Sequence, residues 1–294
     1  MVKNIKKIIF AVLLLGLLGG LTEYFGPSIG VDKESVINSK ESIEASGLAP
    51  IISAEGAILI DAEDGSVIYE KDADKKLYPA STTKIMTALI ALETLEEIDG
   101  DLSSETIIPA DAVGTEGSSV YLKEGEIVTV EELLYGTMLR SGNDAATALA
   151  ICLGGTEKNF IQKMNEKAHE LGCKSTNFAN PTGLFDEKHY TTARELANIS
   201  REAMKNEKFR KIVAVSSWES TGSGRNFINK NKTIYEYSGA TGIKIGYTKK
   251  SGRTLVASAK KEGVELIAVV LNDSNWFEDA YSMLDYGFER KGIE

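Results

Sequence analysis

The chain has 294 residues, of which 43% are hydrophobic, enough to bury a core in one large domain or two small ones. The formal net charge is −10, and no Lys/Arg-rich run follows the first residues, which argues against nucleic-acid binding because that function needs a basic face. With two histidines and no H-E-x-x-H or C-x-x-C spacing, the sequence lacks a zinc motif, and we expect no metal and no cofactor.

The N-terminal segment has the pattern of an export signal. Three lysines, the last of them Lys7, precede an uncharged apolar stretch over residues 8–21. This stretch is shorter than the roughly 20 apolar residues of a membrane span, and no clear cleavage site follows it. We therefore expect residues 1–26 to be a signal peptide or an N-terminal membrane anchor, so that the protein is exported and either secreted or tethered. Residues 27–50 are polar and aperiodic, as in a linker.

Residues 51–294 have the pattern of one globular domain. Apolar runs on both sides of Asp64-Gly65 predict a β-hairpin over residues 56–72, and a second hairpin is predicted over residues 253–271. Helices are predicted from residue 81, over residues 129–153 with a break at 141–143, and over residues 157–171, 191–205 and 276–289. Thr129 and Thr192 each precede a glutamate by three residues, which predicts two capping boxes.

The order of these elements predicts the fold class. Hairpin, helices, hairpin and helix follow one another, as expected for an α+β fold with one antiparallel sheet assembled from both ends of the domain. Helices would flank the sheet, and an all-helical lobe would be inserted between its two halves. Cys152 and Cys173 fall in predicted helices, and we interpret both as small buried hydrophobes; in an exported protein a disulfide is the alternative.

The segment "PASTTKIMTAL", residues 79–89, places Ser81 three residues before Lys84. On a helix, positions i and i+3 share a face, so the lysine amine would lie within reach of the serine hydroxyl. A serine needs a base to become a nucleophile, and a buried lysine, whose charged form is disfavoured, can be that base. The alternative is a serine that caps the helix and a solvated lysine. A second S-x-x-K pair, Ser258 and Lys261, lies on a predicted strand, where the two side chains would not share a face.

Two further patterns could complete a site. Ser141-Gly142-Asn143 interrupts a helical region and offers a hydroxyl and an amide that could bridge the lysine and a substrate carbonyl. In "TGIKIGYTKKSG", Lys244 precedes Gly246 just ahead of a strand pattern. The lysine could bind a carboxylate, and the glycine would let a substrate lie close to the strand edge. Each pattern taken alone also fits an ordinary turn.

In this order the three patterns match the S-x-x-K, S-x-N and K-T-G set of serine acyl-transferring enzymes. From about residue 51 to residue 288, the sequence resembles the penicillin-binding D-alanyl-D-alanine carboxypeptidases, low-molecular-weight serine peptidases of the S-x-x-K type. The resemblance rests on "YPASTTKIMTAL", "GSSVYLKEGEIVTVEELLYGTMLRSGNDAA", "NPTGLFDEKHYTTARELA" and "TGIKIGYTKKSGRTLVASAK". It implies a β-lactamase/transpeptidase-like fold, in agreement with the order of elements.

The resemblance also implies a role for each matching residue. Ser81 would attack the carbonyl of the penultimate D-alanine of a peptidoglycan stem peptide, and Lys84 would take its proton. The terminal D-alanine would leave, and water would hydrolyse the acyl-enzyme. Ser141 and Asn143 would relay protons and hold the substrate, and Lys244 would orient the terminal carboxylate. β-Lactam antibiotics would acylate Ser81 as substrate mimics.

On the strand of the third pattern, the resemblance implies an oxyanion hole formed by the backbone N–H groups of Ser81 and Tyr247, next to Gly246. One position departs from the family: Ile245 stands where K-T-G has threonine and lacks the hydroxyl that would contact the substrate carboxylate. We expect Thr248 or Arg253 to compensate, and otherwise expect weaker substrate binding. We also expect no C-terminal β-rich domain, so any membrane tether would come from the N-terminal segment.

Other functions stay open at this point. A class A β-lactamase would need a deacylating glutamate near the nucleophile, and the one E-x-x-x-N, Glu202 to Asn206, is interpreted as surface. A D,D-endopeptidase would use the same residues on cross-linked peptides. A non-catalytic module that binds peptidoglycan or β-lactams is favoured only by Ile245, since a pure binder need not keep a nucleophile and its base together.

Overall fold

The computed structural model describes residues 48–293. The predicted export segment, residues 1–26, and nearly all of the predicted linker lie outside the described residues. From Ala49 onward the described chain forms one compact unit. Within residues 48–293, no helix combines the length and the apolar character that a membrane crossing requires.

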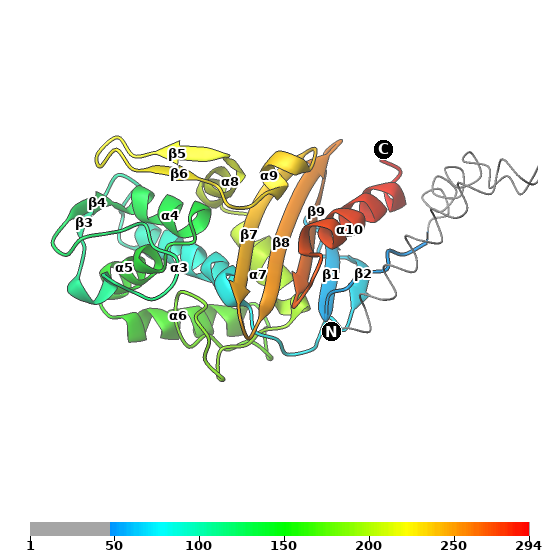
Figure 1. The fold of residues 1–294 in the computed structure, drawn as a ribbon, viewed down its shortest axis with the longest axis horizontal. Coiled ribbons are helices and arrows are strands. Elements are labelled where there is room, and N and C mark those ends of the chain that lie inside the picture. Colours follow the sequence, from blue (N-terminus) through cyan, green and yellow to red (C-terminus); the bar gives the residue numbers. More distant parts are fainter. Residues whose placement is uncertain (1–47, 294) are drawn as a thin grey trace, which may run out of the picture. The chain divides into compact units, whose positions relative to one another are not determined.

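The centre of this unit is a five-stranded antiparallel sheet with the strand order β2-β1-β9-β8-β7 (Figure 1). Both predicted hairpins are present, because β1 pairs with β2 and β8 pairs with β9. Two strands come from the start of the unit and three from its end, which confirms the predicted assembly of the sheet. The strands are Gly56–Asp61 (β1), Val67–Lys71 (β2), Ala240–Thr248 (β7), Gly252–Lys261 (β8) and Val264–Leu271 (β9).

Both faces of the sheet are buried. On β9, Ile267 and Val269 pack toward the inserted helices, whereas Leu266 and Ala268 belong to a second core layer that includes residues of α10 (Trp276–Arg290). Because each face of the strand meets a helical layer, both sets of alternating side chains are apolar. This explains why "VELIAVVL" is an almost continuous apolar run.

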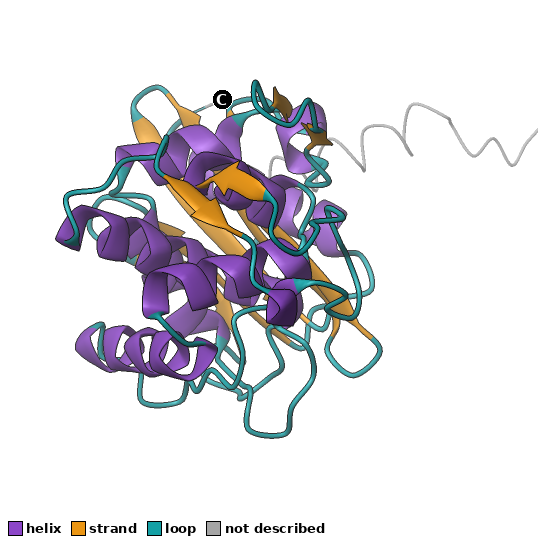
Figure 2. Cartoon of the chain, turned by 90° about the vertical axis from the view of Figure 1, so that its left-hand side faces the viewer, coloured by secondary structure: helices purple, strands orange, loops and turns teal. Residues whose placement is uncertain are grey.

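The inserted helices cover the face of the sheet opposite α10. In Figure 2, helices lie in front of the strands of the sheet. α3 runs through the middle of this part, and each of its residues from Lys84 to Leu92 is buried, since α4, α5, α6 and α7 pack around it. The predicted α+β fold with an inserted helical lobe is thus confirmed. The helices are α3 (Lys84–Glu97), α4 (Val130–Leu139), α5 (Asn143–Gly154), α6 (Glu157–Glu170), α7 (Ala193–Ala203) and α8 (Glu207–Ala214).

Some elements had no counterpart in the sequence analysis. α8 is one of them, and so are the four-residue helix α9 (Thr233–Glu236) and two small antiparallel sheets. β3 (Glu105–Ile107) pairs with β4 (Ile127–Thr129), and β5 (Ser217–Glu219) pairs with β6 (Asn226–Ile228). Strands of three residues are too short to show an alternating pattern, so nothing in the sequence separates them from loops.

The start of α3 differs from the prediction. Ser81 lies in a 3-10 turn, Ala80–Thr83, and the α-helix itself begins at Lys84. No side chain caps either element at its N-terminus. The alternative in which Ser81 is a helix cap is therefore excluded, and its hydroxyl is left for other contacts.

The two predicted capping boxes are half formed. Thr129 and Thr192 accept hydrogen bonds from the backbone N–H groups of Glu132 and Glu195, each at 3.1 Å, as predicted. Neither glutamate returns the bond. The Glu132 carboxylate is bound by side chains of the β5–β6 hairpin, and the Glu195 carboxylate by backbone N–H groups that follow α6. Each glutamate carboxylate therefore accepts from residues distant in the chain, in place of the backbone N–H group of the capping threonine.

Cys152 and Cys173 are both free thiols, so the structure does not have the alternative disulfide between them. Cys173 is buried as predicted, whereas Cys152, in α5, is only partly buried. Cys173 follows the end of α6 instead of lying within a helix. The chain leaves the helix at Gly172, whose φ of +77° is a conformation that glycine adopts without strain.

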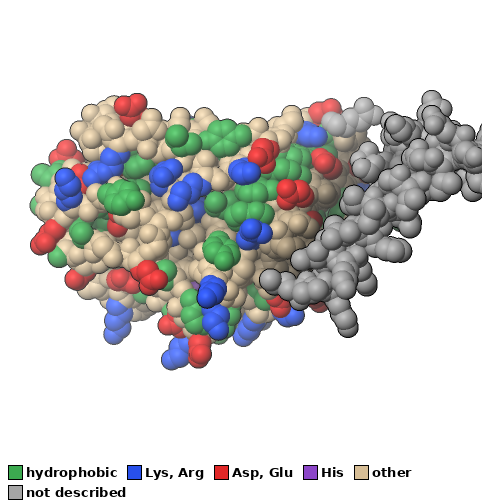
Figure 3. Space-filling view, viewed as in Figure 1, with side chains coloured by type: hydrophobic (Ala, Val, Ile, Leu, Met, Phe, Trp, Pro, Cys, Tyr) green, Lys and Arg blue, Asp and Glu red, His purple; other side chains and the backbone are tan. Residues whose placement is uncertain are grey.

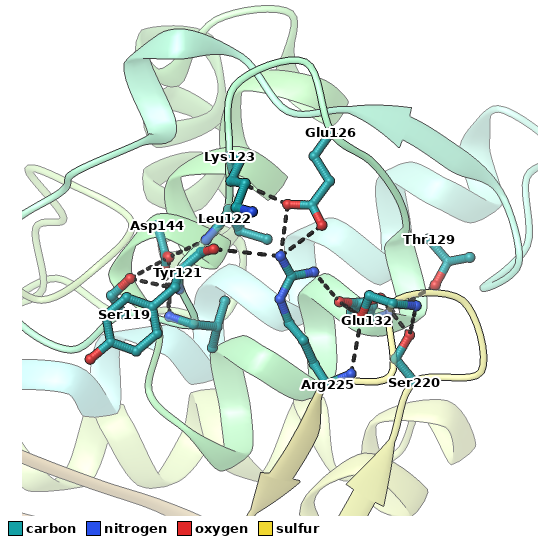
Figure 4. A network of polar contacts seen from close by, with 12 residues as sticks. Ser119, Tyr121, Leu122, Lys123, Glu126, Thr129, Glu132, Asp144, Ser220 and Arg225 are labelled. Carbon is teal, nitrogen blue, oxygen red and sulfur yellow. Dashed lines mark hydrogen bonds and ion pairs between the residues drawn. The ribbon is translucent and has the colours of Figure 1, made fainter.

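A nearly buried charge network ties the β5–β6 hairpin to the inserted helices (Figure 4). The Arg225 guanidinium donates to the Glu132 carboxylate at 2.6 Å and to both carboxylate oxygens of Glu126 at 2.7 Å. The Ser220 and Ser223 hydroxyls donate to Glu132 at 2.6 and 2.7 Å. The Glu132 side chain is 3% exposed and that of Arg225 is 18% exposed, so water cannot replace these partners.

We predict that Arg225→Met lowers the free energy of unfolding by about 2–3 kcal/mol, because it leaves the Glu132 carboxylate buried without its cation. Urea denaturation followed by circular dichroism measures the loss. Arg194→Met is the matched control, since Arg194 also bonds two carboxylates but its partners Glu70 and Asp74 are 51% and 72% exposed. The control should lose less than about 1 kcal/mol. Equal losses would contradict the role given to the buried network.

Candidate active site

The turn that carries Ser81 is held in place from several sides. The Thr82 and Thr254 hydroxyls both donate to the carbonyl oxygen of Pro79, at 2.6 and 2.9 Å, which fixes the turn to β8. Ala80 has a φ of +50°, a left-handed conformation that is uncommon for a residue with a side chain. Such a conformation persists where the surrounding contacts enforce it.

Two glycines supply those surroundings. A Cβ atom on Gly183 would lie 1.9 Å from the Ala80 carbonyl oxygen, and one on Gly246 would lie 2.7 Å from the Ser81 nitrogen. Any side chain at either position would therefore displace the turn. The sequence analysis expected Gly246 to let a substrate approach the strand; the structure shows that its missing side chain lets β7 approach the serine itself.

The Lys84 amine connects Ser81 to two other segments. Its Nζ lies 3.0 Å from Ser81 Oγ, 2.7 Å from Asn143 Oδ1 and 2.5 Å from the Thr182 carbonyl oxygen. The Lys84 side chain is completely buried. The solvated-lysine alternative is therefore excluded, and the predicted neighbourhood of Ser81, Lys84 and Asn143 is present.

Burial and neighbouring positive charges disfavour the charged form of Lys84. Its pKa is lowered well below the usual lysine value, mainly by burial and further by the charges of Lys244 and Lys230. An uncharged amine has two N–H groups and one lone pair. Asn143 Oδ1 and the Thr182 carbonyl oxygen can only accept hydrogen bonds, so they accept from the two N–H groups of the amine. The lone pair is then left for the Ser81 hydroxyl, which is the arrangement of a base with its nucleophile.

The orientation of Asn143 is fixed by the segment before α4. Its Nδ2 group donates to the Glu116 carbonyl oxygen at 2.5 Å, and its backbone N–H donates to the Ser118 carbonyl oxygen at 2.7 Å. Because the amide nitrogen is engaged there, Oδ1 must face Lys84. Gly117 leaves room for this contact, since a Cβ atom there would lie 2.8 Å from Asn143 Nδ2.

Asp144 holds that segment against α5. Its buried carboxylate accepts from the backbone N–H groups of Val120 and Leu122, at 3.0 and 3.2 Å, and from the Ser119 hydroxyl at 2.6 Å. These contacts appear beside the Arg225 network in Figure 4. A residue next to Asn143 in the chain thus positions the backbone that holds Asn143.

A third segment brings the Thr182 carbonyl to the amine. Asn180 Oδ1 accepts from the backbone N–H groups of Thr182 and Gly183, at 3.1 and 2.8 Å, forming a tight turn. His189 braces the same segment: its Nδ1 accepts from the Ala179 N–H at 3.2 Å, so Nε2 carries the proton toward Thr83 Oγ1 at 2.8 Å. Burial lowers the pKa of His189 to about 4, which keeps it neutral.

Lys244 lies within β7, not ahead of it as the sequence analysis expected. It pairs across the sheet with Val256 and is 1% exposed, and its Nζ donates to the Ile245 carbonyl oxygen at 3.0 Å. Burial, followed by the charge of Lys230, lowers its pKa to about 7. Lys230 reaches toward Ser118, with 3.4 Å between Nζ and Oγ. On the face of the molecule seen in Figure 1, the space-filling view of Figure 3 shows basic side chains between the helical part and β7.

The Ser81 pocket, a hollow of about 360 Å³, gathers part of the predicted set. Ser81, Asn143, Tyr247 and Thr248 line it together with Gly117, Ser118, Thr182, Gly183 and Leu184. Lys84 lies beneath it, bonded to Ser81 and Asn143. None of the lining residues is an aspartate or a glutamate, so nothing that lines the pocket resembles the deacylating glutamate of a class A β-lactamase. Glu202 instead pairs with Lys205 on the surface, at 2.7 Å.

Besides Lys84, four predicted residues are not among those that line the Ser81 pocket: Ser141, Lys244, Gly246 and Arg253. Ser141 is 6% exposed, with a φ of +61°, in the chain reversal that leads to Asn143. The Thr248 hydroxyl is shared with Ser251 Oγ at 2.7 Å. Arg253 lines a neighbouring hollow instead, although Tyr247 borders both.

Ile245 packs on the opposite face of β7 from Lys244 and Gly246. It pairs with Leu255 across the sheet and contacts the core layer under α10. The isoleucine methyl groups are thus accommodated by apolar neighbours. Of the two residues expected to replace the missing hydroxyl, Thr248 lines the Ser81 pocket and Arg253 lines the neighbouring hollow; the replacement itself stays a prediction.

The sequence analysis did not single out Thr182, Gly183, Asn180 or Asp144. The signal that was available is the segment "NPTG", residues 180–183, in which asparagine, proline and glycine together favour a tight turn. Such a turn is common in loops. Only the tertiary structure shows that this one presents a carbonyl group to a lysine 98 residues away.

The family model, the similar sequences and the similar solved structures all indicate one family. Residues 43–275 match the model of the D-alanyl-D-alanine carboxypeptidase family. The chain is 39% identical over 243 residues to the D-alanyl-D-alanine carboxypeptidase DacF of Bacillus subtilis, covering 81% of this chain and 62% of that protein. It therefore spans less than two thirds of the length of the Bacillus relative.

A shorter relative is covered more completely. A D-alanyl-D-alanine carboxypeptidase of a Streptomyces species is 35% identical over 257 residues, which are 81% of this chain and 88% of that protein. The crystal structure of a Streptomyces DD-transpeptidase matches with a TM-score of 0.76 at 33% identity, covering 82% of this chain and 99% of the other. These matches confirm the predicted β-lactamase/transpeptidase-like fold.

We predict that Gly246→Ala slows labelling of Ser81 by a fluorescent penicillin at least about 100-fold, since a displacement of reacting atoms by about 1 Å can have this effect. The new Cβ would meet Thr254 Oγ1 at 2.5 Å and the Ser81 nitrogen at 2.7 Å. Gel fluorescence over time measures the rate. Gly222→Ala is the control, because its nearest atom lies 3.9 Å away. Normal labelling of Gly246→Ala would show that the close approach is not needed.

Proposed function

Because the chain belongs to the D-alanyl-D-alanine carboxypeptidase family, we propose that it is a serine-type carboxypeptidase that removes the terminal D-alanine from peptidoglycan stem peptides. The observation that carries the proposal is the set of contacts at Lys84 Nζ: one nucleophilic hydroxyl and two oxygens that can only accept. This arrangement suits acyl transfer, because it keeps the lone pair of a buried amine directed at Ser81 Oγ.

In the first step, Ser81 Oγ attacks the carbonyl carbon of the penultimate D-alanine while Lys84 Nζ takes the hydroxyl proton. The backbone N–H groups of Ser81 and Tyr247 bind the oxygen that becomes negative. The peptide C–N bond then breaks, and the leaving nitrogen of the terminal D-alanine receives a proton relayed from Lys84 through Ser141. Asn143 holds the lysine and the substrate during this exchange.

In the second step, water attacks the ester formed on Ser81. Lys84, neutral again after the first step, accepts a proton from the water as the oxygen adds to the ester carbonyl. The ester C–O bond breaks, Ser81 Oγ regains a proton, and the shortened peptide leaves. The same residues serve both steps, which supports a serine peptidase that needs no metal and no cofactor.

Lys244 is assigned to the carboxylate of the terminal D-alanine. It is buried near Lys84, with Lys230 nearby, so an anion entering the pocket meets the positive charges of Lys244 and Lys230. Gly246 is assigned to the close approach of β7 to Ser81, and Tyr247 and Thr248 to the strand edge along which the substrate lies. Among the described residues, β7 is an edge strand of the sheet, so one of its edges can pair with an extended peptide.

β-Lactams are proposed as covalent inhibitors, because a strained cyclic amide can acylate the same serine. A family that acts on peptidoglycan works outside the cytoplasm. We therefore propose that residues 1–26 direct export and hold the protein at the membrane if they are retained. Nucleic acid is not among the proposed partners.

A second candidate is transpeptidation. It is favoured by one observation, the likeness to a structure named a Streptomyces DD-transpeptidase. The chemistry differs only in the acceptor, an amine in place of water at the second step. An endopeptidase would differ in the leaving group, which would be a cross-linked peptide.

The test is incubation with an acetylated pentapeptide ending in D-alanyl-D-alanine, followed by mass spectrometry. Wild-type protein should release one alanine, and Ser81→Ala should release none while remaining folded. When an amine acceptor is added to the incubation, product carrying that amine in place of the terminal D-alanine would indicate transpeptidation instead. Release of no alanine, together with no covalent adduct from a fluorescent penicillin, would favour the non-catalytic binding module.

The pKa of Lys244 predicts how the activity depends on pH. Its pKa is lowered to about 7, so the lysine is charged below that pH and loses its charge as the pH rises through it. The kcat/KM for a peptide with a free terminal carboxylate should therefore fall about tenfold above pH 7, since a charge-assisted hydrogen bond is lost. Lys244→Arg, which stays charged, should remove this alkaline decline. An unchanged decline in that variant would assign the titration to another group.

A further inference from the structure

A second hollow of about 420 Å³ lies beside the Ser81 pocket. We call it the Arg253 pocket; its lining is Ser53, Tyr247, Gly252, Arg253, Asn272, Asp273 and Ser274. Tyr247 borders both hollows, so they meet at this residue of β7. The side chains of Tyr247 and its partner Arg253 lie on the α10 face of the sheet, whereas Gly246 and its partner Thr254 lie on the face of the Ser81 turn. The Arg253 pocket sits where β8 begins, where β9 has ended and just before α10 starts.

Arg253 is the basic group of this pocket and is exposed to solvent. Its guanidinium donates one hydrogen bond, to the Ser274 carbonyl oxygen at 3.0 Å, and lies 6.0 Å from the centre of the Trp276 ring. Within residues 48–293 it has no carboxylate at ion-pair distance. A guanidinium has five N–H donors, so most of them are available to a ligand in the geometry that suits a carboxylate.

The acidic residue of the pocket is buried, unlike Arg253. Asp273 is 2% exposed, and burial raises the pKa of its carboxyl group. The Ser53 hydroxyl donates to Asp273 Oδ1 at 2.5 Å, and the Ser53 backbone N–H donates to Asp279 Oδ2 at 2.5 Å. Both carboxyl groups are thus engaged by Ser53 beneath the surface. The exposed part of the pocket carries the positive charge of Arg253.

The order of residues along β7 gives the direction of a bound peptide. Gly246 packs against the Ser81 nitrogen; Lys244 precedes it, and Tyr247 and Thr248 follow it. With the terminal carboxylate at Lys244, the acyl part of the substrate leaves Ser81 in the opposite direction. It then passes Tyr247, whose cross-strand neighbour is Arg253.

We propose that the Arg253 pocket is a subsite for a side-chain carboxylate on the residue that precedes the two D-alanines. This proposal rests on the proposed function, because it uses the direction that Lys244 gives to the substrate. Arg253 then selects among stem peptides: it favours those whose third residue from the end carries a free carboxylate over those in which this group is an amide or an amine.

Three peptides whose side chains each contain four methylene groups test the subsite. They are N-acetyl peptides ending in D-alanyl-D-alanine and preceded by L-2-aminopimelate, its side-chain carboxamide, or L-lysine. Wild-type protein should release alanine from the carboxylate peptide with a kcat/KM about tenfold higher than from the other two, the usual gain from a charge-assisted hydrogen bond. Equal values for all three would overturn the subsite while leaving the proposed function intact.

Variants assign the preference to Arg253. Arg253→Gln should remove it by lowering kcat/KM for the carboxylate peptide alone, and Arg253→Glu should reverse it in favour of lysine. Lys250→Gln is the control, since Lys250 lies on the same hairpin over the Phe185 ring and should leave the preference unchanged. An equal loss for all three peptides in Arg253→Gln would place Arg253 on the terminal carboxylate and overturn the proposal, as would loss of the preference in the Lys250 control.

The outcomes also separate this proposal from the proposed function. Release of no alanine from any of the three peptides by wild-type protein would overturn both. A fluorescent penicillin without a second carboxylate should label Arg253→Gln as fast as wild type, because Arg253 does not border the Ser81 pocket. Slower labelling of that variant would contradict the subsite and indicate damage to the Ser81 turn.

Discussion

The site depends on one costly feature, a lysine amine buried without a bonded carboxylate. Lys84 contacts a hydroxyl, an amide oxygen and a peptide carbonyl, all uncharged. A carboxylate in their place would hold the proton on the amine and remove its basicity. Uncharged acceptors satisfy the N–H groups and leave burial and the nearby lysines to lower the pKa. The rest of the site can be understood as the scaffold that brings these three oxygens to one nitrogen.

That scaffold is made of segments far apart in the chain. Asn143 is supplied by the start of α5, and the Thr182 carbonyl by a loop braced by His189. Three glycines, at positions 117, 183 and 246, let the backbones approach Asn143 and the Ser81 turn more closely than any side chain would permit. Close backbone packing therefore positions the Ser81 turn and Asn143. The Arg225 network holds the β5–β6 hairpin, which leads to Lys230.

Local charge and total charge have opposite signs in this protein. The chain carries a formal net charge of −10, yet the charges of Lys230 and Lys244 act on Lys84 beside the Ser81 pocket, and the lining of that pocket lacks aspartate and glutamate. An anionic group near the pocket is attracted by this local arrangement, because nearby charges in a partly buried site dominate over distant, screened ones. Arg253, just beyond Tyr247, extends the positive region along the proposed path of the peptide.

The sequence by itself determined the elements with long periodic patterns, namely both large hairpins and most of the long helices. It also indicated that Ser81 and Lys84 lie close together, because they are only three residues apart in the chain. It did not locate the 3-10 turn at Ser81, the three-residue strands or the tertiary partners of Glu132 and Glu195, since local propensity is weak over so few residues. Only the tertiary structure decided that Thr182 and Gly183 belong to the site and that Arg253 borders a separate pocket. Those contacts join positions about 100 residues apart, or positions on opposite faces of one strand, and no local pattern encodes either.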